Sequence, residues 1–308
     1  MSVKNGEKYV AKAAESILNQ TFKNFEFIIV NNDSNDHTPE ILSTFERKDS
    51  RVKIIKNSNN EKPSEGRMRG IKETKYDWFA LMDADDESHP DRFQQQIEFI
   101  NKSEMDNLAI LSTYGKYINK NSKIIANKFT GPTNLKDFKD IYYAKEDNFA
   151  IIDPSTIIKK SAFLKVGGYL NETFAYDIDL YFKIAEEGYL IQTIKSPLYF
   201  YRVHPGSYSV THAMKQREVT HFVNYNMRQR RNGNDEITKK QFYKDFWSKS
   251  LYRIPRKVFD YAMTCYKIAG FSLIEKKILS FFVYFTIAFV ISPRYVLTRI
   301  YQQFIKRN

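Results

Sequence analysis

Three carboxylates lie directly after an apolar stretch of the sequence. Trp78–Met82 has the length of a buried strand and leads into Asp83-Ala84-Asp85-Asp86. Neighbouring carboxylates repel one another unless a cation lies among them. Mg²⁺ and Mn²⁺ prefer oxygen ligands, and they commonly bind one or two protein carboxylates together with phosphate oxygens. The motif therefore predicts a metal site that holds a nucleotide diphosphate.

The same acids have a second interpretation as helix caps. The segment 92–100 follows closely, and its apolar residues repeat at helical spacing. Aspartate is a favoured N-cap residue, so Asp85 and Asp86 could cap that helix. The local pattern leaves both interpretations open.

The elements that would position these acids alternate between helix and strand. The pattern predicts helices at 8–20, 39–45 and 67–73, and strands at 26–30, 52–56 and 78–82. Such alternation indicates an α/β fold with a mostly parallel sheet and helices on both faces. Ligands of such sheets bind beyond the carboxyl ends of the strands. Because 31–36 and 83–86 both follow strands, we expect the two loops to line one crevice.

The later part of the chain is mixed and then helical. Strands are expected at 109–117, 123–126 and 191–198, with a helix at 178–187. We expect one domain at 1–210 and a helical region at 211–308. Segment 278–292 carries no charge and is too short for a helix to span the roughly 30 Å hydrocarbon core. We expect segment 278–292 to be an anchor in the membrane interface, and the basic, aromatic tail 295–308 to lie among the headgroups. The alternative is that 278–292 is a buried core helix.

Composition narrows the functional class. The chain has 308 residues, 42% of them hydrophobic, which is enough for a substantial core. Cys265 is the single cysteine and excludes an intramolecular disulfide. The net charge is +12, with basic residues concentrated after Arg202, which favours an anionic membrane surface as partner. We expect no nucleic-acid binding, because no signature of such a module is present. The N-terminus has no signal-peptide pattern, so we expect a cytoplasmic protein.

Six segments carry motifs in a characteristic order. They are Asn5–Phe22, Ile28–Asp36, Asp83–Asp86, Asp153–Ser155, Gly167–Leu180 and Tyr201–Ser207. In this order they resemble the family 2 inverting glycosyltransferases, which have the GT-A fold and include many bacterial enzymes of surface-polysaccharide synthesis. The resemblance covers about residues 1–210. It implies transfer of a sugar from a nucleotide-diphospho-sugar to an acceptor hydroxyl.

The resemblance assigns the acceptor side of the site. Asp177 would be the catalytic base that takes the proton of the attacking hydroxyl. Asp179 is a further candidate, although both acids could instead be first-turn residues favoured by the helix dipole. Ser155 lies in a segment that resembles an acceptor-side loop.

The donor side is assigned in the same way. Asp85 would bind Mn²⁺ or Mg²⁺, which offsets charge on the departing diphosphate, while Asp83 would contact the ribose. Asp86 would cap a helix or orient its neighbour. Arg67 would bind the diphosphate or nucleotide, with a solvated helix position as its alternative. His204 could reach the metal or diphosphate, or could be a surface residue.

Two further residues complete the expected donor site. Arg202 precedes His204 by two residues in an extended segment, so both should point to one face. Asn32 lies in the expected nucleotide-binding loop, where Asn31-Asn32 replaces the acidic pair usual in the family. We expect this replacement to affect which nucleotide-sugar donor the site binds.

The largest departure from the family pattern is at the N-terminus. Only Met1–Val3 precedes Lys4, where the family has a whole apolar strand. Loss of a central strand would leave buried backbone groups unpaired, at a cost of about 1 to 3 kcal/mol each. Two hypotheses follow: the start lies inside a longer reading frame, or the protein is a degraded, inactive copy.

Three functional hypotheses are consistent with these residues. The first is a metal-dependent glycosyltransferase that uses a UDP-sugar and a saccharide or lipid-linked acceptor at the inner face of the cell membrane. The second is a nucleotidyltransferase, which gives the Asp177 segment no role. The third is an inactive, membrane-bound scaffold with the same fold.

Overall fold

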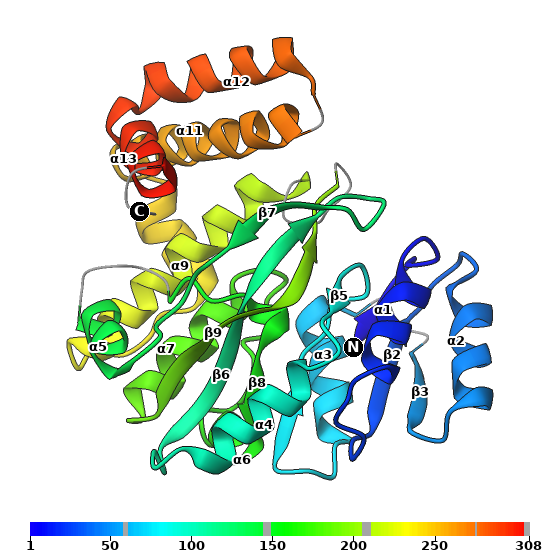
Figure 1. The fold of residues 1–308 in the computed structure, drawn as a ribbon. Coiled ribbons are helices and arrows are strands. Elements are labelled where there is room, and N and C mark those ends of the chain that lie inside the picture. Colours follow the sequence, from blue (N-terminus) through cyan, green and yellow to red (C-terminus); the bar gives the residue numbers. More distant parts are fainter. Residues whose placement is uncertain (58–60, 144–148, 205–210, 275, 305–308) are drawn as a thin grey trace. The chain divides into compact units, whose positions relative to one another are not determined.

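The computed structural model describes residues 1–57, 61–143, 149–204, 211–274 and 276–304. The chain forms two compact units, Met1–Arg202 and Val203–Asn308. The boundary that the sequence suggested, at residue 210, falls in a segment outside the described residues. Figure 1 shows the course of the chain through both units.

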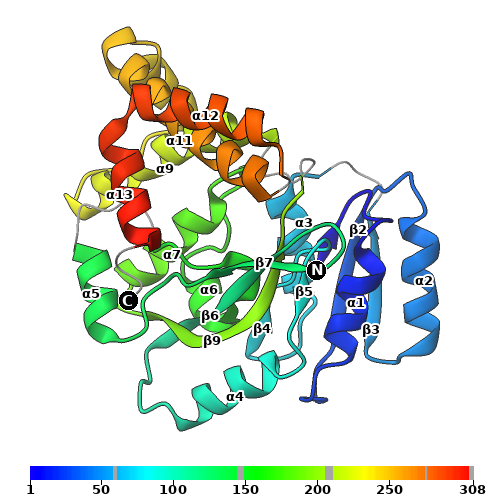
Figure 2. The same ribbon diagram turned by 45° about the horizontal axis from the view of Figure 1, so that its top comes forward.

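A three-stranded parallel sheet with helices on both faces opens the first unit. Its strands, in the order β1-β2-β3, are β1 (Ser2–Val3), β2 (Phe27–Asn32) and β3 (Val52–Asn57). Helices α1 (Val10–Leu18) and α2 (Thr38–Lys48) lie beside it, as Figure 2 shows. Helix α3 (Pro63–Lys72) follows β3. The parallel sheet flanked by helices was expected from the alternation of elements, and it is confirmed.

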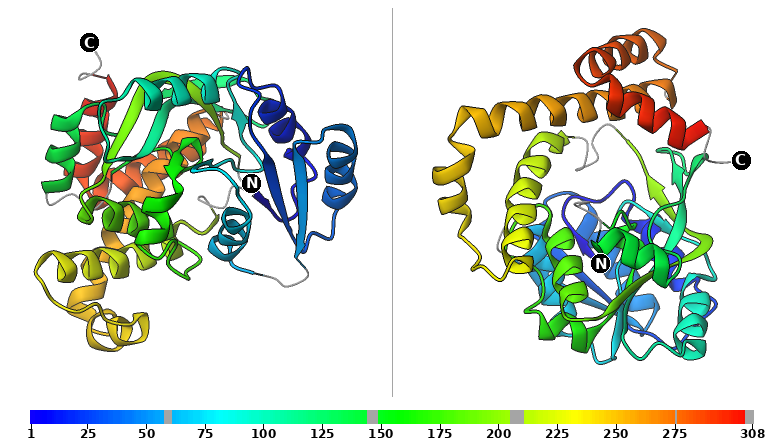
Figure 3. Two further views of the ribbon diagram at one scale, coloured as in Figure 1. Left: turned by 90° about the horizontal axis from the view of Figure 1, so that it is seen from below. Right: turned by 90° about the vertical axis from the view of Figure 1, so that its left-hand side faces the viewer.

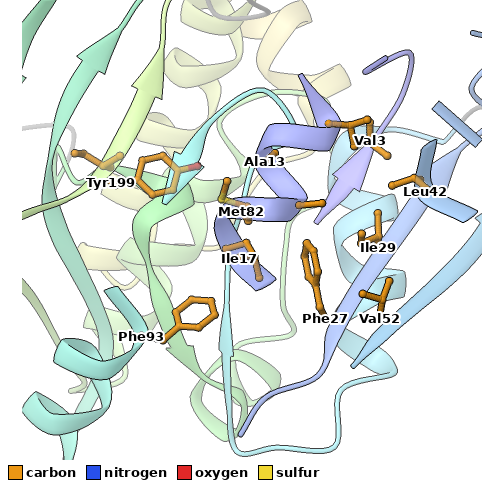
Figure 4. Packing of buried hydrophobic residues seen from close by; sticks show 13 residues of the cluster. Val3, Ala13, Ile17, Phe27, Ile29, Leu42, Val52, Met82, Phe93 and Tyr199 are labelled. Atoms are coloured by element: carbon orange, nitrogen blue, oxygen red, sulfur yellow. The ribbon is translucent and has the colours of Figure 1, made fainter. Parts of the chain in front are cut away.

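The side chains of β2 explain how the helices cover this sheet. Successive residues of a strand point to opposite faces. Phe27 and Ile29 pack into a cluster with residues of α1 and α2 (Figure 4). Ile28 and Val30 lie on the other face, against Gly70 of α3. The apolar part of β2, Phe27–Val30, is therefore buried between two helical layers.

The spacing of buried residues also accounts for α1. Val10, Ala13, Ala14 and Ile17 are buried, and they recur at the i, i+3, i+4, i+7 positions of one helical face. This face joins the same cluster as Phe27. The helix thereby holds β2 and the loop before it in place.

The second sheet of the first unit is mixed. Its strands are β4 (Trp78–Ala80), β5 (Glu87–Ser88), β6 (Leu108–Ile118), β7 (Ile124–Lys128), β8 (Ile157–Lys159) and β9 (Leu190–Arg202). They lie in the order β4-β8-β6-β9-β5, with β7 paired to β6, and only β6 and β9 are parallel. Its helical segments are α4 (Arg92–Lys102), α5 (Leu135–Tyr143), η1 (Asp153–Ser155), α6 (Lys160–Lys165) and α7 (Tyr176–Glu186). A bridge between Ser2 and Asp83 joins the two sheets.

The described elements of the second unit are helical. They are α9 (Ala213–Arg231), α10 (Lys239–Phe242), η2 (Tyr243–Trp247), α11 (Ser250–Ile274), α12 (Ile278–Ile291) and α13 (Pro293–Phe304). Cys265, Ala288 and Val296 form a small buried cluster of α11, α12 and α13. The right-hand view of Figure 3 follows these helices in orange and red. Within the described ranges, no single helix meets the length and hydropathy needed to cross a membrane; α12 and α13 do so only as a pair, bent by 115°.

Candidate functional site

The two polar loops predicted to share a crevice lie on either side of β1. Val3 pairs with Asn31 at the end of β2, and Ser2 is bridged to Asp83 just beyond β4. Because both loops leave the carboxyl ends of their strands, they lie at the same edge of the first unit. This short strand therefore brings the nucleotide loop next to the acidic motif.

Arg67 lies at the centre of the polar cluster. From α3 its guanidinium donates to Asp83 at 2.6 Å and to Asp153 at 2.5 Å. Its side chain is only 12% exposed, and its charge lies 5.6 Å from the centre of the Tyr176 ring. A buried guanidinium needs such partners, because an unpaired charge in this position would be costly. The alternative interpretation of Arg67, as a solvated residue on a helix surface, is therefore wrong.

Asp153 is a central residue that the sequence did not single out. It lies in η1, accepts a hydrogen bond from Arg67 at 2.5 Å and another from the hydroxyl of Tyr181. The sequence identified the Asp153–Ser155 segment, but only Ser155 was taken as a candidate. A signal was present, since a carboxylate in a matched motif is a stronger candidate for polar chemistry than its serine neighbour.

Asp177 lies in the first turn of α7, where the backbone enters through Ala175 at a φ of 57°. Burial and, after it, the negative charge of Asp153 raise the pKa of Asp177, and the positive charge of Arg67 opposes them; the resulting pKa is about 7. A carboxyl that titrates near neutral pH can accept a proton during a reaction and release it afterwards. Asp177 therefore has the properties of a general base.

The capping interpretation of the acidic motif is wrong. Helix α4 begins at Arg92, so Asp91 occupies its N-cap position. Asp86 is instead buried and accepts a hydrogen bond from the backbone N–H of Arg202 at 2.7 Å. Burial raises the pKa of Asp86 well above its ordinary value, and the charge of Asp85 raises it further.

Arg202 holds this acidic loop from within the protein. Its Nε donates to the carbonyl of Asp85 at 2.6 Å, and its Nη1 to the carbonyl of Asn119 at 2.7 Å. It also forms an ion pair with Glu87, in which the arginine side chain is fully buried. Arg202 was expected to share a face and a donor-site role with His204. Its donors are instead directed at the protein backbone and Glu87, so Arg202 is a positioning residue.

The remaining candidates have different surroundings. Asn32 is buried at the end of β2, where its side-chain Oδ1 accepts a hydrogen bond from Nδ2 of Asn57 at 2.6 Å. Ser155 is fully buried and donates to the carbonyl of Ile152 at 2.7 Å, so it packs its loop and does not face an acceptor. Asp179 is buried and pairs with Lys183 one turn later, at 2.9 Å. His204 belongs to the second unit, so its approach to a metal stays a prediction.

The donor set fits a cation that phosphate groups help to bind. Among the described residues, no group of three or more His, Cys, Asp or Glu side chains is arranged to hold a metal alone. A Mg²⁺ or Mn²⁺ ion needs only one or two protein carboxylates when phosphates supply other ligands. Burial raises the pKa of Asp83. The positive charge of Arg67 lowers this pKa, and the negative charge of Asp85 raises it. A cation beside Asp83 and Asp85 would relieve this concentration of negative charge.

Comparison with known proteins places the chain in a family. Residues 1–167 match Glycosyl transferase family 2. The O-antigen biosynthesis glycosyltransferase WbnJ of Escherichia coli is 29% identical over 241 residues, which cover 72% of this chain and 91% of that protein. The UDP-Glc:alpha-D-GlcNAc-diphosphoundecaprenol beta-1,3-glucosyltransferase WfaP of Escherichia coli is 29% identical over 209 residues, covering 67% and 76%.

Solved structures show the same fold at lower identity. S. aureus TarS 1–349 in complex with UDP-GlcNAc has a TM-score of 0.60 and 15% identity, over 98% of this chain and 90% of that one. The mannosyltransferase PcManGT from Pyrobaculum calidifontis, in complex with GDP-Man and Mn²⁺, has a TM-score of 0.57 and 13% identity, over 100% and 86%. The family match extends over more than half of this chain and agrees with the order of its motifs. The protein therefore belongs to glycosyl transferase family 2 and has the GT-A fold.

Proposed function

We propose that this glycosyltransferase transfers a sugar from a nucleotide-diphospho-sugar to an acceptor hydroxyl, with inversion and with the help of Mn²⁺ or Mg²⁺. The observation that carries the proposal is Asp177, a carboxyl with a pKa of about 7 that shares the polar cluster of Arg67 and Asp153. A general base and a site for negative phosphate groups are the two requirements of this reaction.

Different residues would act on the acceptor and on the donor. Asp177 takes the proton of the acceptor hydroxyl as that oxygen forms a bond to the anomeric carbon. The bond from this carbon to the diphosphate breaks on the opposite face, and its electron pair leaves with the diphosphate. Arg67 would leave one of its carboxylate partners to bind the phosphates, because a guanidinium matches their geometry.

Asp85 and Asp83 would hold the divalent cation on the donor side. When bound, the cation would offset the charge that builds on the leaving diphosphate. Asp83 would also be within reach of the ribose, and Asn32 lies in the adjoining nucleotide loop. His204 is proposed as a further ligand from the second unit.

The substrates are proposed from the known relatives. WfaP is named for a UDP-Glc donor and a diphosphoundecaprenol-linked acceptor, and the TarS and PcManGT structures contain UDP-GlcNAc and GDP-Man. For this chain we propose a UDP-sugar donor and a saccharide or lipid-linked acceptor, in cell-surface polysaccharide synthesis. Asn31-Asn32, in place of an acidic pair, makes the donor base the first variable to test.

The surface of the second unit supports a place at the membrane. Leu279 and Val290 of α12 are 81% and 74% exposed, and no charged residue lies within that helix. Lys276 and Lys277 precede it, and Arg294 follows. An apolar surface flanked by cations is typical of helices that lie in the interface of an anionic bilayer. We propose that this unit binds the inner face of the cell membrane, where it would meet a lipid-linked acceptor.

A donor panel tests the proposal. The full chain is incubated with UDP-Glc, UDP-GlcNAc, UDP-Gal and GDP-Man, each with Mn²⁺, with Mg²⁺ or with EDTA. Nucleotide binding is measured by calorimetry and donor turnover by release of UDP or GDP. We expect metal-dependent binding and turnover for at least one UDP-sugar. Absence of both for every donor would overturn the proposal.

A further inference from the structure

One face of the second sheet carries a lysine and two tyrosines from three neighbouring strands. Tyr117 of β6 is paired with Tyr201 of β9, and Gly115 of β6 is paired with Lys128 of β7. Paired residues point to the same face of a sheet, and so do residues two positions apart in one strand. Lys128, Tyr117 and Tyr201 therefore lie on one face at adjoining positions. We call them the lysine–tyrosine cluster.

The two rings hold the ammonium group of Lys128. Its Nζ lies 4.3 Å from the ring centre of Tyr201 and 5.1 Å from that of Tyr117. The rings themselves meet edge to face, with 5.9 Å between their centres. The negative face of an aromatic ring attracts a cation at such distances. The position of the ammonium group is thereby defined without a carboxylate.

The charge of Lys128 has no ion-pair partner in the part of the chain that the structure describes, and its Nζ donates no hydrogen bond to a described residue. Other cations of the first unit differ in this respect, since Arg202 pairs with Glu87 and Lys183 with Asp179. An ammonium group has three N–H donors, and two aromatic rings offer no oxygen to accept them. The partner that this group lacks is an oxygen anion, such as a phosphate or a carboxylate.

On the β9 side, this face leads to the acidic motif. Tyr199 precedes Tyr201 by two residues and points to the same side, about 7 Å away along the strand. The hydroxyl of Tyr199 accepts a hydrogen bond from the backbone N–H of Asp83 at 3.4 Å. Figure 4 shows Tyr199 pointing from β9 toward Met82, the residue before Asp83. Tyr201 packs against the same buried cluster.

On the β6 side, the same face leads to Asp153. A Cβ on Gly115 would lie 2.9 Å from Cδ1 of Ile152, so Ile152 covers this face of β6. The next residue, Asp153, is the partner of Arg67 in the polar cluster. The lysine–tyrosine cluster and the candidate active site therefore lie on one face of the second sheet.

The donor has other partners for its charge. Its diphosphate is proposed to bind Arg67 and the divalent cation beside Asp83 and Asp85. Lys128 pairs with none of the described carboxylates, so its charge is left for the second substrate. A neutral acceptor would not use this charge, whereas an acceptor with an anionic group would.

We propose that the lysine–tyrosine cluster is an acceptor subsite, in which Lys128 binds a phosphate or carboxylate group of the acceptor. The assignment of this ligand as the acceptor rests on the proposed function. Two sources share the required chemistry: the diphosphate of a lipid-linked acceptor, and a uronic acid within a saccharide acceptor. Lys128 is thus a specificity-determining residue, which favours anionic acceptors over neutral ones.

The experiment measures binding in the absence of donor, metal and turnover. The full chain in EDTA is titrated with N-acetylglucosamine 1-phosphate, methyl glucuronide and the neutral methyl glucoside, and each Kd is measured by NMR. Lys128→Met keeps an apolar stem over the rings but removes the charge, and Lys128→Arg keeps the charge. Lys116→Met is the matched control, because Lys116 precedes Tyr117 and points to the opposite face of β6.

We expect wild type to bind one of the two anionic probes at least about tenfold more tightly than methyl glucoside, and Lys128→Met to lose this preference. Lys128→Arg and Lys116→Met should keep it within about threefold. Preference for the phosphate would identify the lipid-linked source, and preference for the uronate the saccharide source. Equal binding of all three probes by wild type would overturn the proposal, as would an equal loss in Lys116→Met.

A second titration separates this subsite from the donor site. The Kd of UDP with Mn²⁺ should change less than about twofold in Lys128→Met, because Lys128 does not bind the donor in this proposal. A loss of UDP binding as large as the loss for the anionic probe would place Lys128 in the donor site and contradict the proposal. If wild type binds no UDP but shows the Lys128-dependent preference, the proposed function fails and the anion site stands.

Discussion

Asp153 links the two halves of the polar cluster. Its carboxylate accepts hydrogen bonds from Arg67, which also holds Asp83 on the donor side, and from Tyr181 of α7. Its negative charge also disfavours ionisation of Asp177. One carboxylate therefore restrains the arginine that is proposed to bind phosphate and adjusts the proton affinity of the proposed base.

Replacing the proposed base should abolish transfer and spare donor binding. Asp177→Asn keeps the size of the side chain but cannot take a proton at neutral pH, so we expect transfer to fall by about 10² to 10⁴-fold. The nucleotide Kd, measured by calorimetry with Mn²⁺, should change less than about threefold. Asp140→Asn, on the exposed α5, is the control and should retain activity. Persistent transfer in the Asp177 variant would show that another group is the base.

The same variant should change how stability depends on pH. The folded-state pKa of Asp177 is about 7, above its ordinary value of 3.8, so the folded chain binds this proton more tightly than the unfolded chain does. The contribution of Asp177 to stability is therefore present at low pH and is lost as pH rises from about 4 to 7. Urea unfolding of Asp177→Asn should show a gain on the order of 2 kcal/mol at pH 8 and a smaller gain at pH 5. An equal gain at both pH values would contradict the assigned shift.

Neutralising Asp153 should move the pH–rate profile. In Asp153→Asn, Asp177 loses a nearby negative charge and Arg67 loses a competing partner, and both changes favour the ionised form of Asp177. The acid limb of kcat/KM should shift to lower pH by about one unit. The profile is measured with the donor that the wild-type chain uses best. A limb that stays in place while activity falls would make Asp153 a purely structural residue.

Among the secondary-structure elements, strand β9 holds the acidic motif in position. It runs parallel to β6 and ends at Arg202, whose backbone and side chain both bind the Asp85–Glu87 segment. Helix α3 approaches β1 and β2 closely at Gly66. A Cβ at this position would lie 2.7 Å from the hydroxyl of Ser2 and 3.2 Å from the side-chain nitrogen of Asn32. Glycine at this position thus lets Arg67, the next residue, reach between the two loops.

Removing the charge of Arg202 should destabilise this arrangement. Arg202→Met removes a buried guanidinium that pairs with Glu87 and donates to the carbonyls of Asp85 and Asn119, so we expect a loss of about 3 to 5 kcal/mol in the free energy of unfolding. Lys136→Met is the matched control, because its ion pair with Asp140 is exposed and should contribute less than about 1 kcal/mol. Urea titrations measure both. Similar losses in the two variants would contradict the role of Arg202 within the loop.

At the scale of the whole molecule, the candidate catalytic residues and the exposed apolar helix belong to different units. The first, Met1–Arg202, contains the acidic motif and the proposed base. The second, Val203–Asn308, carries the exposed apolar residues of α12 and the cations at its ends. This division agrees with the proposal of a water-soluble donor and an acceptor held at a membrane.

The apolar surface of α12 should drive binding to vesicles. We expect the double variant Leu279→Asp, Val290→Asp to lose at least about tenfold in affinity for vesicles that contain phosphatidylserine, measured by flotation. Asn232→Asp, Ser248→Asp changes the net charge equally at exposed positions of the same unit and serves as the control. Binding of the wild-type chain should weaken as salt rises from 50 to 500 mM. Equal binding by the two double variants would show that charge alone attracts the unit.

The sequence alone predicted many of the elements and their order, although not the short strands β1, β5 and β8. Helical periodicity predicts α1, strand-length apolar runs predict β2 and β4, and ordered motifs indicate the family and the regions that contain Asp83, Asp85 and Asp177. These features are local, because a period or a strand end is encoded within a few neighbouring residues. They place a polar residue at the end of a strand or helix without specifying the direction of its side chain.

Only the tertiary structure decided which polar residues meet. Arg67 and Asp153 are 86 positions apart, and Arg202 and Asp85 are 117 apart. Ser155 and Arg202 had the right residue type in the right motif, yet partners distant in sequence, Ser112 and Asn119, help to direct both into the protein. A largely apolar cavity beside β2 likewise depends on β4, α1 and α3 enclosing one space. Side-chain direction and cavities are set by contacts between distant segments, which local sequence does not encode.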